Sequence, residues 1–560
     1  MAPAEPPQRS GLLAAAGLAA GELRPVIVLA VLIVVLSCLP YLVGYLAAPP
    51  DRVFGGFVLD EIDSNTYLAI MQQGAQGQWS ATLLYTPEDH PALILYVFYL
   101  ALGHVAAGLG LPLILVYHAA RIGCGLILLV TLYLFLTLFL TSKRERWTAY
   151  LLAATGSGIG WLLAALAGNM APAGVSPIDF WLMEAYVFFT LFLFPHSALA
   201  MALLMGMLGA MVIYFGQEGK VRSWLLALGF GLTLALVNPY VLVIAGLILA
   251  GYWLVVWGIR GRLPLREGLA LAAMGLVLAP FMAGYALQFN RHPVWRSFFA
   301  QDIVPSPPLW YYMAGYGLIF ALALPGAWHV LKRRDERQWL LVAWPLLACL
   351  ASYVPLSGQR RMIFGAVIPL AALGAIGLLC AVVPAIQRSR LAAWLSARDY
   401  SHDRLGGLIT ALVVALASIS NLVLLSGSTV SAAMAHPSIT QPAAVEEALA
   451  WLGENGPADA VILSSYPIGN VIPARIGRRV VWGHWDETAF FDQKRADVAV
   501  FFDLATPGGE RQAILARYGV DYLFYGPGEQ PLGQFDPSTA PYLEETYCNL
   551  MVTIYRITTD

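Results

Sequence analysis

Long apolar runs separated by short polar segments dominate the chain. They cover residues 26–47, 112–141, 147–168, 182–215, 222–237, 240–259, 268–288, 310–331, 338–355, 363–386 and 405–427. A helix needs about 20 predominantly apolar residues to cross a bilayer, so the pattern predicts about eleven transmembrane helices. The run 182–215 is too long for one span, and Pro195 divides it into a predicted half-helix (182–194) and a full span (197–215).

Whether a further apolar run at 91–108 spans the membrane is decided from the distribution of basic residues, because cytoplasmic loops are enriched in Lys and Arg. If this run does not span and the N-terminus is inside, the inside segments hold 18 basic residues and the outside loops between helices hold 5. If it spanned, every later loop would change side and the bias would reverse. We therefore predict a surface helix at 91–108 within one long outside loop, about 48–111, with a cytoplasmic N-terminus and an outside C-terminus.

The pattern changes after residue 427, where hydropathy falls and shorter periodic segments begin. These segments predict helices at 442–454 and 508–518, and strands at 459–465, 519–525 and 550–557. The predicted fold is a membrane all-α bundle over 1–427, followed by a small extracytoplasmic α/β domain over 428–560. The localisation expected is integral to the cell membrane, with this domain periplasmic or extracellular.

The composition agrees with a membrane protein. Hydrophobic residues make up 59% of the chain and charged residues 12%, about half the charged share of a usual soluble domain. The first apolar run has no small-residue cleavage site, so we expect a retained helix and not a removable signal peptide. The short inside loops contain no glycine-rich nucleotide loop, which favours a lipid-linked substrate over a nucleotide sugar and gives no reason to expect a nucleic-acid partner.

The first outside loop is acidic and contains the sequence Asp60-Glu61-Ile62-Asp63. Carboxylates three residues apart at a helix start lie on one face, near the positive end of the helix dipole. For Asp63 an N-terminal helix cap is an equally good interpretation. Asp60 and Glu61 follow the first span closely, where a carboxylate can deprotonate an acceptor or hold a cation.

Other ionisable residues lie in or beside apolar stretches. Asp179 and Glu184 flank the start of the broken run, and Glu184 is inside an apolar stretch, where an ionisable group is a functional candidate. His196 is a weaker candidate, since a lone histidine is more often simply hydrogen-bonded. In the tail, His484 and Glu487 can contact a substrate or a metal ion, although a solvated turn is the simpler interpretation.

Basic residues form the second candidate centre. Arg360 and Arg361 lie at the outer end of the tenth span, and two adjacent guanidinium groups suit a phosphate. The alternative is an anchor that reaches to the membrane interface. Arg121, within the outer half of the second span, is a further candidate. Together, basic groups that hold a phosphate leaving group and a carboxylate that activates a hydroxyl or amine suit sugar transfer from a lipid phosphate.

The ordered set of motifs resembles the GT-C integral-membrane glycosyltransferases, and most of all the glycosyltransferase 39 branch. The motifs are Leu59-Asp60-Glu61, Tyr67-Leu68-Ala69, Gly77-Gln78-Trp79, His90-Pro91, Arg121, Gln359-Arg360-Arg361 and Pro369-Leu370. The resemblance implies that Asp60 or Glu61 is the catalytic carboxylate and that the basic residues bind a polyprenyl phosphate. The family often has lysine where this chain has His90, which puts a phosphate contact there in doubt.

Two further points limit the resemblance. The tail lacks the Trp-Trp-Asp-Tyr-Gly motif of oligosaccharyltransferases, which disfavours transfer of a whole glycan to asparagine. In the oligosaccharyltransferase branch a divalent ion is bound, and Asp60, Asp63, Asp179 and Glu184 would suit one, so metal dependence stays open. The function expected is an inverting glycosyltransferase with a polyprenyl-phosphate sugar donor, a lipid, glycan or protein acceptor, and membrane lipids around it. A transporter or flippase and a non-catalytic scaffold are the alternatives.

Overall fold

The computed structural model describes residues 12–167, 177–216, 220–355, 357–389 and 401–558. The chain forms two compact units, each assembled from three separate segments. The helical unit comprises Met1–Cys38, Arg121–Met282 and Val304–Gly427. The mixed unit comprises Leu39–Ala120, Ala283–Ile303 and Ser428–Asp560.

Seven stretches among the described residues are long and apolar enough to cross a membrane. They are Gly21–Ala47 of α1 (Leu12–Ala47), α4 (Leu113–Leu136), α8 (Pro195–Gly216), α10 (Pro239–Arg260), α11 (Leu265–Arg291), α13 (Leu309–Arg333), and Gln359–Gln387, which includes α15 (Val367–Gly377) and α16 (Val383–Gln387). The number rises to nine if two pairs of helices, each bent by 45° at a short break, are counted as one span each. These pairs are α5 (Lys143–Thr155) with α6 (Gly160–Ala167), and α18 (His402–Ala417) with α19 (Ile419–Ala433).

The two remaining predicted spans coincide with shorter apolar helices. They are α9 (Val221–Val237) and α14 (Trp339–Ala351). The run at 91–108 contains α3 (Val97–Leu109), whose 13 residues are fewer than a span requires. The prediction of a predominantly helical membrane bundle is confirmed, with seven to nine long spans where about eleven were expected.

The break at Pro195 is present, but the half-helix before it is shorter than predicted. Two 3-10 turns, η2 (Ile178–Phe180) and η3 (Met183–Ala185), precede α7 (Val187–Leu193). Pro195 then opens α8, where its lack of a backbone N–H costs no helical hydrogen bond. The predicted half-helix 182–194 is therefore reduced to its last two turns.

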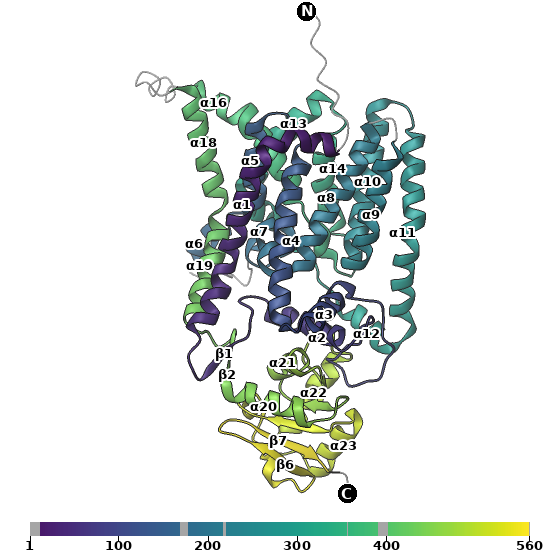
Figure 1. Cartoon of the computed structure of the whole chain (residues 1–560), viewed down its shortest axis with the longest axis vertical. Coiled ribbons are helices and arrows are strands. Elements are labelled where there is room, and N and C mark those ends of the chain that lie inside the picture. The colour runs from purple at the N-terminus through teal and green to yellow at the C-terminus, as the bar shows by residue number, and fades with distance from the viewer. Residues whose placement is uncertain (1–11, 168–176, 217–219, 356, 390–400, 559–560) are drawn as a thin grey trace, which may run out of the picture. The chain divides into compact units, whose positions relative to one another are not determined.

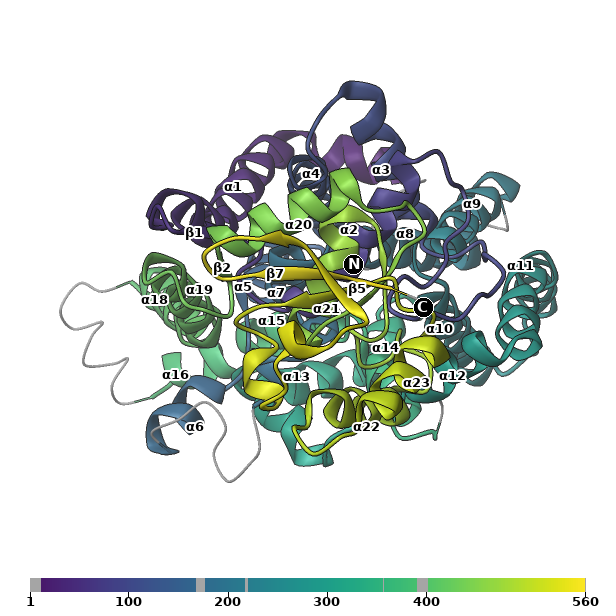
Figure 2. The same cartoon turned by 90° about the horizontal axis from the view of Figure 1, so that it is seen from below.

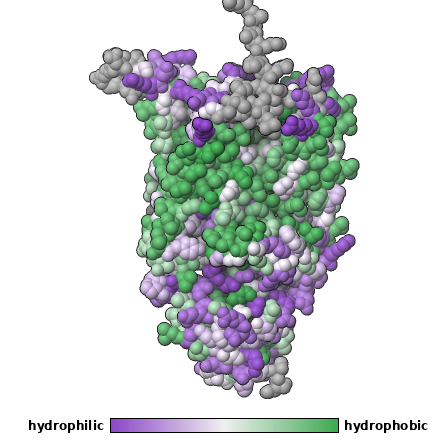
Figure 3. Space-filling view, in the orientation of Figure 1, coloured by the Kyte–Doolittle hydropathy of each residue, from purple (hydrophilic) through white to green (hydrophobic). Residues whose placement is uncertain are grey.

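Apolar side chains also cover the outside of the helical unit. Val28, Leu32 and Val35 of α1 and Leu269 and Leu276 of α11 are all exposed. Figure 3 shows the resulting apolar surface over the long helices, which run alongside one another in Figure 1. A water-soluble unit would not expose so much contiguous apolar surface, whereas lipid would cover it.

The mixed unit contains a five-stranded sheet of order β4-β3-β5-β7-β6. Its strands are β3 (Val461–Leu463), β4 (Arg479–Val480), β5 (Tyr522–Tyr525), β6 (Leu543–Cys548) and β7 (Thr553–Ile557). The first three strands in the order are parallel, and β7 and β6 are antiparallel to their neighbours. The α/β character expected of the tail is confirmed.

Helices cover both faces of this sheet. On one face, α20 (Ala443–Asn455) and α21 (Tyr466–Ile476) share an apolar core with the strands. On the other face lie α22 (Phe491–Phe502) and α23 (Gly508–Tyr518). Figure 2 shows α20 and the pair α22 and α23 on opposite sides of the strands.

The loop predicted at 48–111 belongs to the same compact unit as the tail. Its helix α2 (Glu61–Ala75) packs on α21, and Asn65 donates to the Asn470 side chain at 2.8 Å. Its strand β1 (Arg52–Phe54) pairs with β2 (Thr440–Pro442). Carboxylates from the loop and side chains from the tail therefore share one frame.

Candidate functional site

The first turn of α2 carries the acidic cluster of the loop. Asp60 is the N-cap residue, with a left-handed backbone (φ 50°) and no side-chain capping bond. A non-glycine residue in this conformation costs of the order of 1 kcal/mol, although Asp tolerates it better than most residues. The interpretation of Asp63 as the cap is wrong, because Asp60 holds that position and Asp63 is the third residue of the helix.

Asp63 instead contacts a histidine from the tail. Nε2 of His484 lies 3.1 Å from Oδ1 of Asp63, and Nδ1 lies 2.5 Å from Oδ1 of Asp486. Burial alone would lower the pKa of His484, but the carboxylates of Asp486 and Asp63 raise that pKa well above 6.5. The two carboxylates therefore favour the protonated form of the imidazole.

Glu487 completes this cluster. Its Oε1 accepts a hydrogen bond from the Tyr96 hydroxyl at 2.9 Å, and burial raises the pKa of Glu487 to about 7. His484 is 3% exposed and Glu487 2% exposed, so the interpretation of this segment as a solvated turn is wrong. The segment is buried because it follows β4 and packs at the carboxyl edge of the parallel strands, where α/β folds commonly place functional groups.

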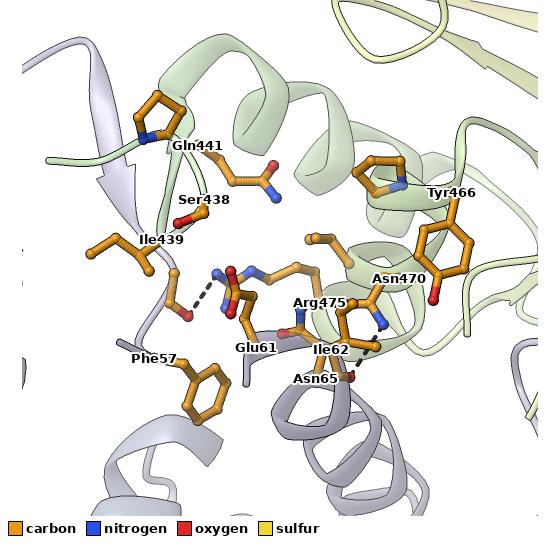
Figure 4. Close-up of a pocket in the computed structure, with 14 residues that line it drawn as sticks. Phe57, Glu61, Ile62, Asn65, Ser438, Ile439, Gln441, Tyr466, Asn470 and Arg475 are labelled. Atoms are coloured by element: carbon orange, nitrogen blue, oxygen red, sulfur yellow. Dashed lines mark hydrogen bonds between the residues drawn. The ribbon is translucent and has the colours of Figure 1, made fainter. Parts of the chain in front are cut away.

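Glu61 lines a cavity of about 270 Å³ within the mixed unit. Figure 4 shows the side chains around it, which come from the first loop, from the segment that contains β2, and from α21. Burial raises the pKa of Glu61 above its ordinary value of 4.5. Arg475 donates to the Gly55 carbonyl at 3.3 Å and pairs with Glu446, which fixes its guanidinium beside the cavity.

Several residues of this site were not identified from the sequence. They are Tyr96, Gln441, Tyr466, Asn470 and Arg475. One local signal was present: Ser465-Tyr466-Pro467 follows an apolar strand, and proline at the second position of α21 marks a helix start. Asn470 and Arg475 are brought to the site by the packing of α21 on α2, Gln441 by the pairing of β2 with β1, and Tyr96 by its hydrogen bond to Glu487.

The basic centre lies in the helical unit, on the 3-10 turn η4 (Gln359–Ile363). The turn is bracketed by Gly358 (φ 67°) and Gly365 (φ 69°), both in the left-handed region that glycine adopts without strain. The guanidinium carbon of Arg360 lies 5.1 Å from the ring centre of Trp181. Its buried Nε has no hydrogen-bond partner among the described residues, which leaves a donor for an anion.

Arg361 and Glu184 form an ion pair. Arg361 Nε lies 3.7 Å from Glu184 Oε1, and the guanidinium carbon is 6.0 Å from the ring centre of Tyr240. The charge of Glu184 in its apolar stretch is therefore balanced by Arg361. Arg361 is paired with Glu184, whereas no carboxylate among the described residues pairs with Arg360. Arg360 is therefore the better candidate for a phosphate contact.

Two candidates of the helical unit have structural partners. Asp179 is fully buried and accepts from the backbone N–H of Gly160, at the start of α6, at 3.0 Å. His196 lies in the first turn of α8, where its Nε2 is 3.1 Å from Ser197 Oγ.

Arg121 and His90 are also engaged. Arg121 is buried in α4 and donates to Ser37 Oγ and Cys38 Sγ, each at 3.2 Å, which ties α4 to α1. His90 Nδ1 lies 2.7 Å from the Glu88 carbonyl oxygen, and its Nε2 accepts from the Leu83 N–H at 2.9 Å. These bonds require the neutral ring, and burial lowers the pKa of His90 accordingly.

The carboxylates considered for a divalent ion are divided between the units. Asp60 and Asp63 belong to the mixed unit, and Asp179 and Glu184 belong to the helical unit. Over the described ranges, no group of three or more His, Cys, Asp or Glu side chains is arranged to hold a metal ion.

Comparison with solved structures identifies known proteins that share this fold. No family model and no curated protein matches the sequence. Among solved structures, the oligosaccharyltransferase AglB from Archaeoglobus fulgidus, in complex with an inhibitory peptide and a dolichol-phosphate, matches 90% of this chain and 69% of its own at 16% identity, with a TM-score of 0.55. ArnT from Cupriavidus metallidurans, bound to undecaprenyl phosphate, matches 94% of this chain and 98% of its own at 13% identity, with a TM-score of 0.52.

These identities are low, so the likeness concerns the fold. It extends over nearly the whole chain and includes both the membrane helices and the tail. The fold expected from the ordered motifs is thereby confirmed: the chain has the GT-C fold of integral-membrane glycosyltransferases.

Proposed function

We propose that this protein is an inverting glycosyltransferase that moves a sugar from a polyprenyl-phosphate donor to an acceptor at the outer face of the membrane. The observation that carries the proposal is the position of Glu61, which lines a cavity at the start of α2, next to Asp60. The polyprenyl phosphates bound to ArnT and AglB support a donor of this class. On this chain, Arg360 is the candidate for the phosphate, because its buried Nε has no hydrogen-bond partner among the described residues.

The chemistry follows from these groups. The carboxylate of Glu61 or Asp60 accepts the proton of the acceptor hydroxyl, whose oxygen then bonds to the anomeric carbon of the donor. The bond between that carbon and the phosphate oxygen breaks on the opposite side, and its electron pair leaves with the polyprenyl phosphate. A cation bound to the phosphate stabilises the negative charge that develops on this leaving group, and the candidates for this role are Arg360 and Arg361 of the helical unit. Attack opposite to the leaving group inverts the anomeric configuration.

The test is release of polyprenyl phosphate by the purified full chain. Donors carrying mannose, glucose or arabinose would be supplied with and without candidate acceptors. We expect release from one of them, with a loss of about 100-fold or more in Glu61→Gln or Asp60→Asn and in Arg360→Ala. The matched controls are Glu510→Gln and Arg495→Ala, both exposed positions of the mixed unit. Equal release by the wild type and all of these variants would refute the assignment.

A further inference from the structure

The cavity beside Glu61 has a lining that the proposed transfer step does not by itself require. Its polar side chains are a carboxylate, a guanidinium, three amides, a hydroxyl and a phenol: Glu61, Arg475, Asn65, Asn470, Gln441, Ser438 and Tyr466. Its apolar surface includes Phe57, Ile439 and Val471. Figure 4 shows Gln441 and Tyr466 on opposite sides of the cavity.

One of these groups lacks a partner. Gln441 Oε1 is buried and has no hydrogen bond to any described residue. A buried amide oxygen without a partner is unfavourable, and a bound hydroxyl or amine would relieve this cost. The amide is held in place because its backbone pairs with Val53 in the β1–β2 ladder.

The neighbouring amides are fixed in advance. Asn65 donates to Asn470 Oδ1 at 2.8 Å, and Asn470 donates to the Ile62 carbonyl at 3.2 Å. Together with Arg475, which is held by Gly55 and Glu446, they form a rigid polar wall. Binding to a rigid site loses little conformational entropy.

Size and chemistry together indicate the ligand class. At about 270 Å³ the cavity lies just below the usual range of small-molecule sites. A single sugar ring offers several hydroxyls to the polar side chains of the lining, and apolar C–H faces to its apolar surface, which includes Phe57, Ile439 and Val471. A serine or threonine side chain offers one hydroxyl and no ring face, so it would fill less of the cavity and contact fewer of its lining groups than a sugar ring does.

We propose that this cavity binds a terminal monosaccharide of the acceptor, so that the acceptor is a glycan or glycolipid and not a protein hydroxyl. The assignment rests on the proposed function for its role as an acceptor site, and it places one sugar hydroxyl at Glu61. Gln441 and Arg475 are the residues that select the saccharide.

The test measures binding without any donor. Saturation-transfer NMR would be recorded on the full-length protein in lipid nanodiscs with methyl glycosides of glucose, galactose, mannose and arabinose, and with a short serine-containing peptide. We expect at least one glycoside to bind, and its affinity to fall at least tenfold in Gln441→Leu and in Arg475→Lys. Gln512→Leu, at an exposed position of α23, is the matched control and should bind as the wild type does.

Binding of no glycoside, equal binding by Gln441→Leu, or peptide binding that depends on Gln441 would each overturn the inference. Folding of the variants is checked by their melting temperature and by polyprenyl phosphate binding. If glycosides bind in a Gln441-dependent way but no donor is ever cleaved, the proposed function fails while the saccharide site stands. If donor is cleaved in an Asp60- or Glu61-dependent way but no glycoside binds, the saccharide site fails while the proposed function stands.

Discussion

Asp60 and Glu61 are adjacent in sequence but have different surroundings. Asp60 is exposed at the left-handed N-cap of α2, whereas Glu61 is half-buried and lines the cavity. A base works best when its pKa approaches the working pH, and burial shifts Glu61 in that direction. The structure therefore favours Glu61 as the base of the pair.

This preference predicts a particular pH profile. A general base must be deprotonated to act, so turnover should fall as the pH is lowered through the pKa of Glu61. Because burial raises this pKa, the fall in turnover should already begin at a pH above 4.5. Glu61→Gln should lose about 100-fold or more in turnover and should no longer show this acidic limb. Turnover measured from pH 4 to 9 checks both points. A retained acidic limb in Glu61→Gln, with a large loss in Asp60→Asn, would assign the base to Asp60.

The His484 cluster predicts how stability depends on pH. A group with a raised pKa in the folded state binds its proton more tightly there, so its contribution to stability declines as pH rises. The stability that Glu487 contributes is therefore lost between pH 4.5 and about 7, and the stability that His484 contributes is lost above pH 6.5. Melting temperatures at pH 5, 7 and 9 should therefore fall more steeply for the wild type than for His484→Gln. Parallel curves would show that the imidazole carries no charge in the folded protein.

At the scale of elements, glycine determines how closely two helices of the helical unit pack. A Cβ on Gly326 of α13 would lie 1.9 Å from the Leu373 carbonyl oxygen of α15, and one on Gly377 would lie 2.1 Å from the Leu322 carbonyl oxygen. Such backbone contact between membrane helices is typical of small residues. In α10, by contrast, a Cβ on Gly258 would meet nothing within 4 Å.

This contrast gives a matched pair of variants. Gly377→Ala should destabilise the protein by about 1–3 kcal/mol through overpacking, while Gly258→Ala should be neutral or slightly stabilising because alanine favours helix. Both substitutions add one methyl group, so their difference isolates the helix contact. Thermal unfolding in detergent, followed by size-exclusion chromatography, measures it. Equal melting temperatures would show that α13 and α15 separate without cost.

Element prediction succeeded where periodicity was strong and failed where it was broken. The structure has α20 and α23 almost where the pattern placed them. It also has α21, which the pattern did not predict because Pro467, Gly469 and Pro473 interrupt it. Pro467 lies at the helix start, and packing on α2 supports the rest. Strand β4 has only two residues, Arg479 and Val480, too few to show any periodicity.

At the scale of the whole molecule, the membrane orientation remains a prediction from charge. The bias of 18 inside basic residues against 5 in the outside loops predicts a cytoplasmic N-terminus and an outside tail. Cys548, exposed on β6, should then react with a membrane-impermeant maleimide in intact cells. Cys548→Ser should abolish that labelling. Labelling of the wild type only after lysis would reverse the predicted orientation.

The sequence by itself determined the membrane character of the chain, the α/β tail and the identity of the acidic and basic candidates. These features depend on local hydropathy, periodicity and charge, which are properties of neighbouring residues. The tertiary structure decided which candidates meet. Asp63 contacts His484 across more than four hundred residues, and Glu61 shares a cavity with Gln441 and Arg475. These pairings depend on long-range contacts, the packing of α2 against α21 and the pairing of β1 with β2, which leave no periodic signal in the segments involved.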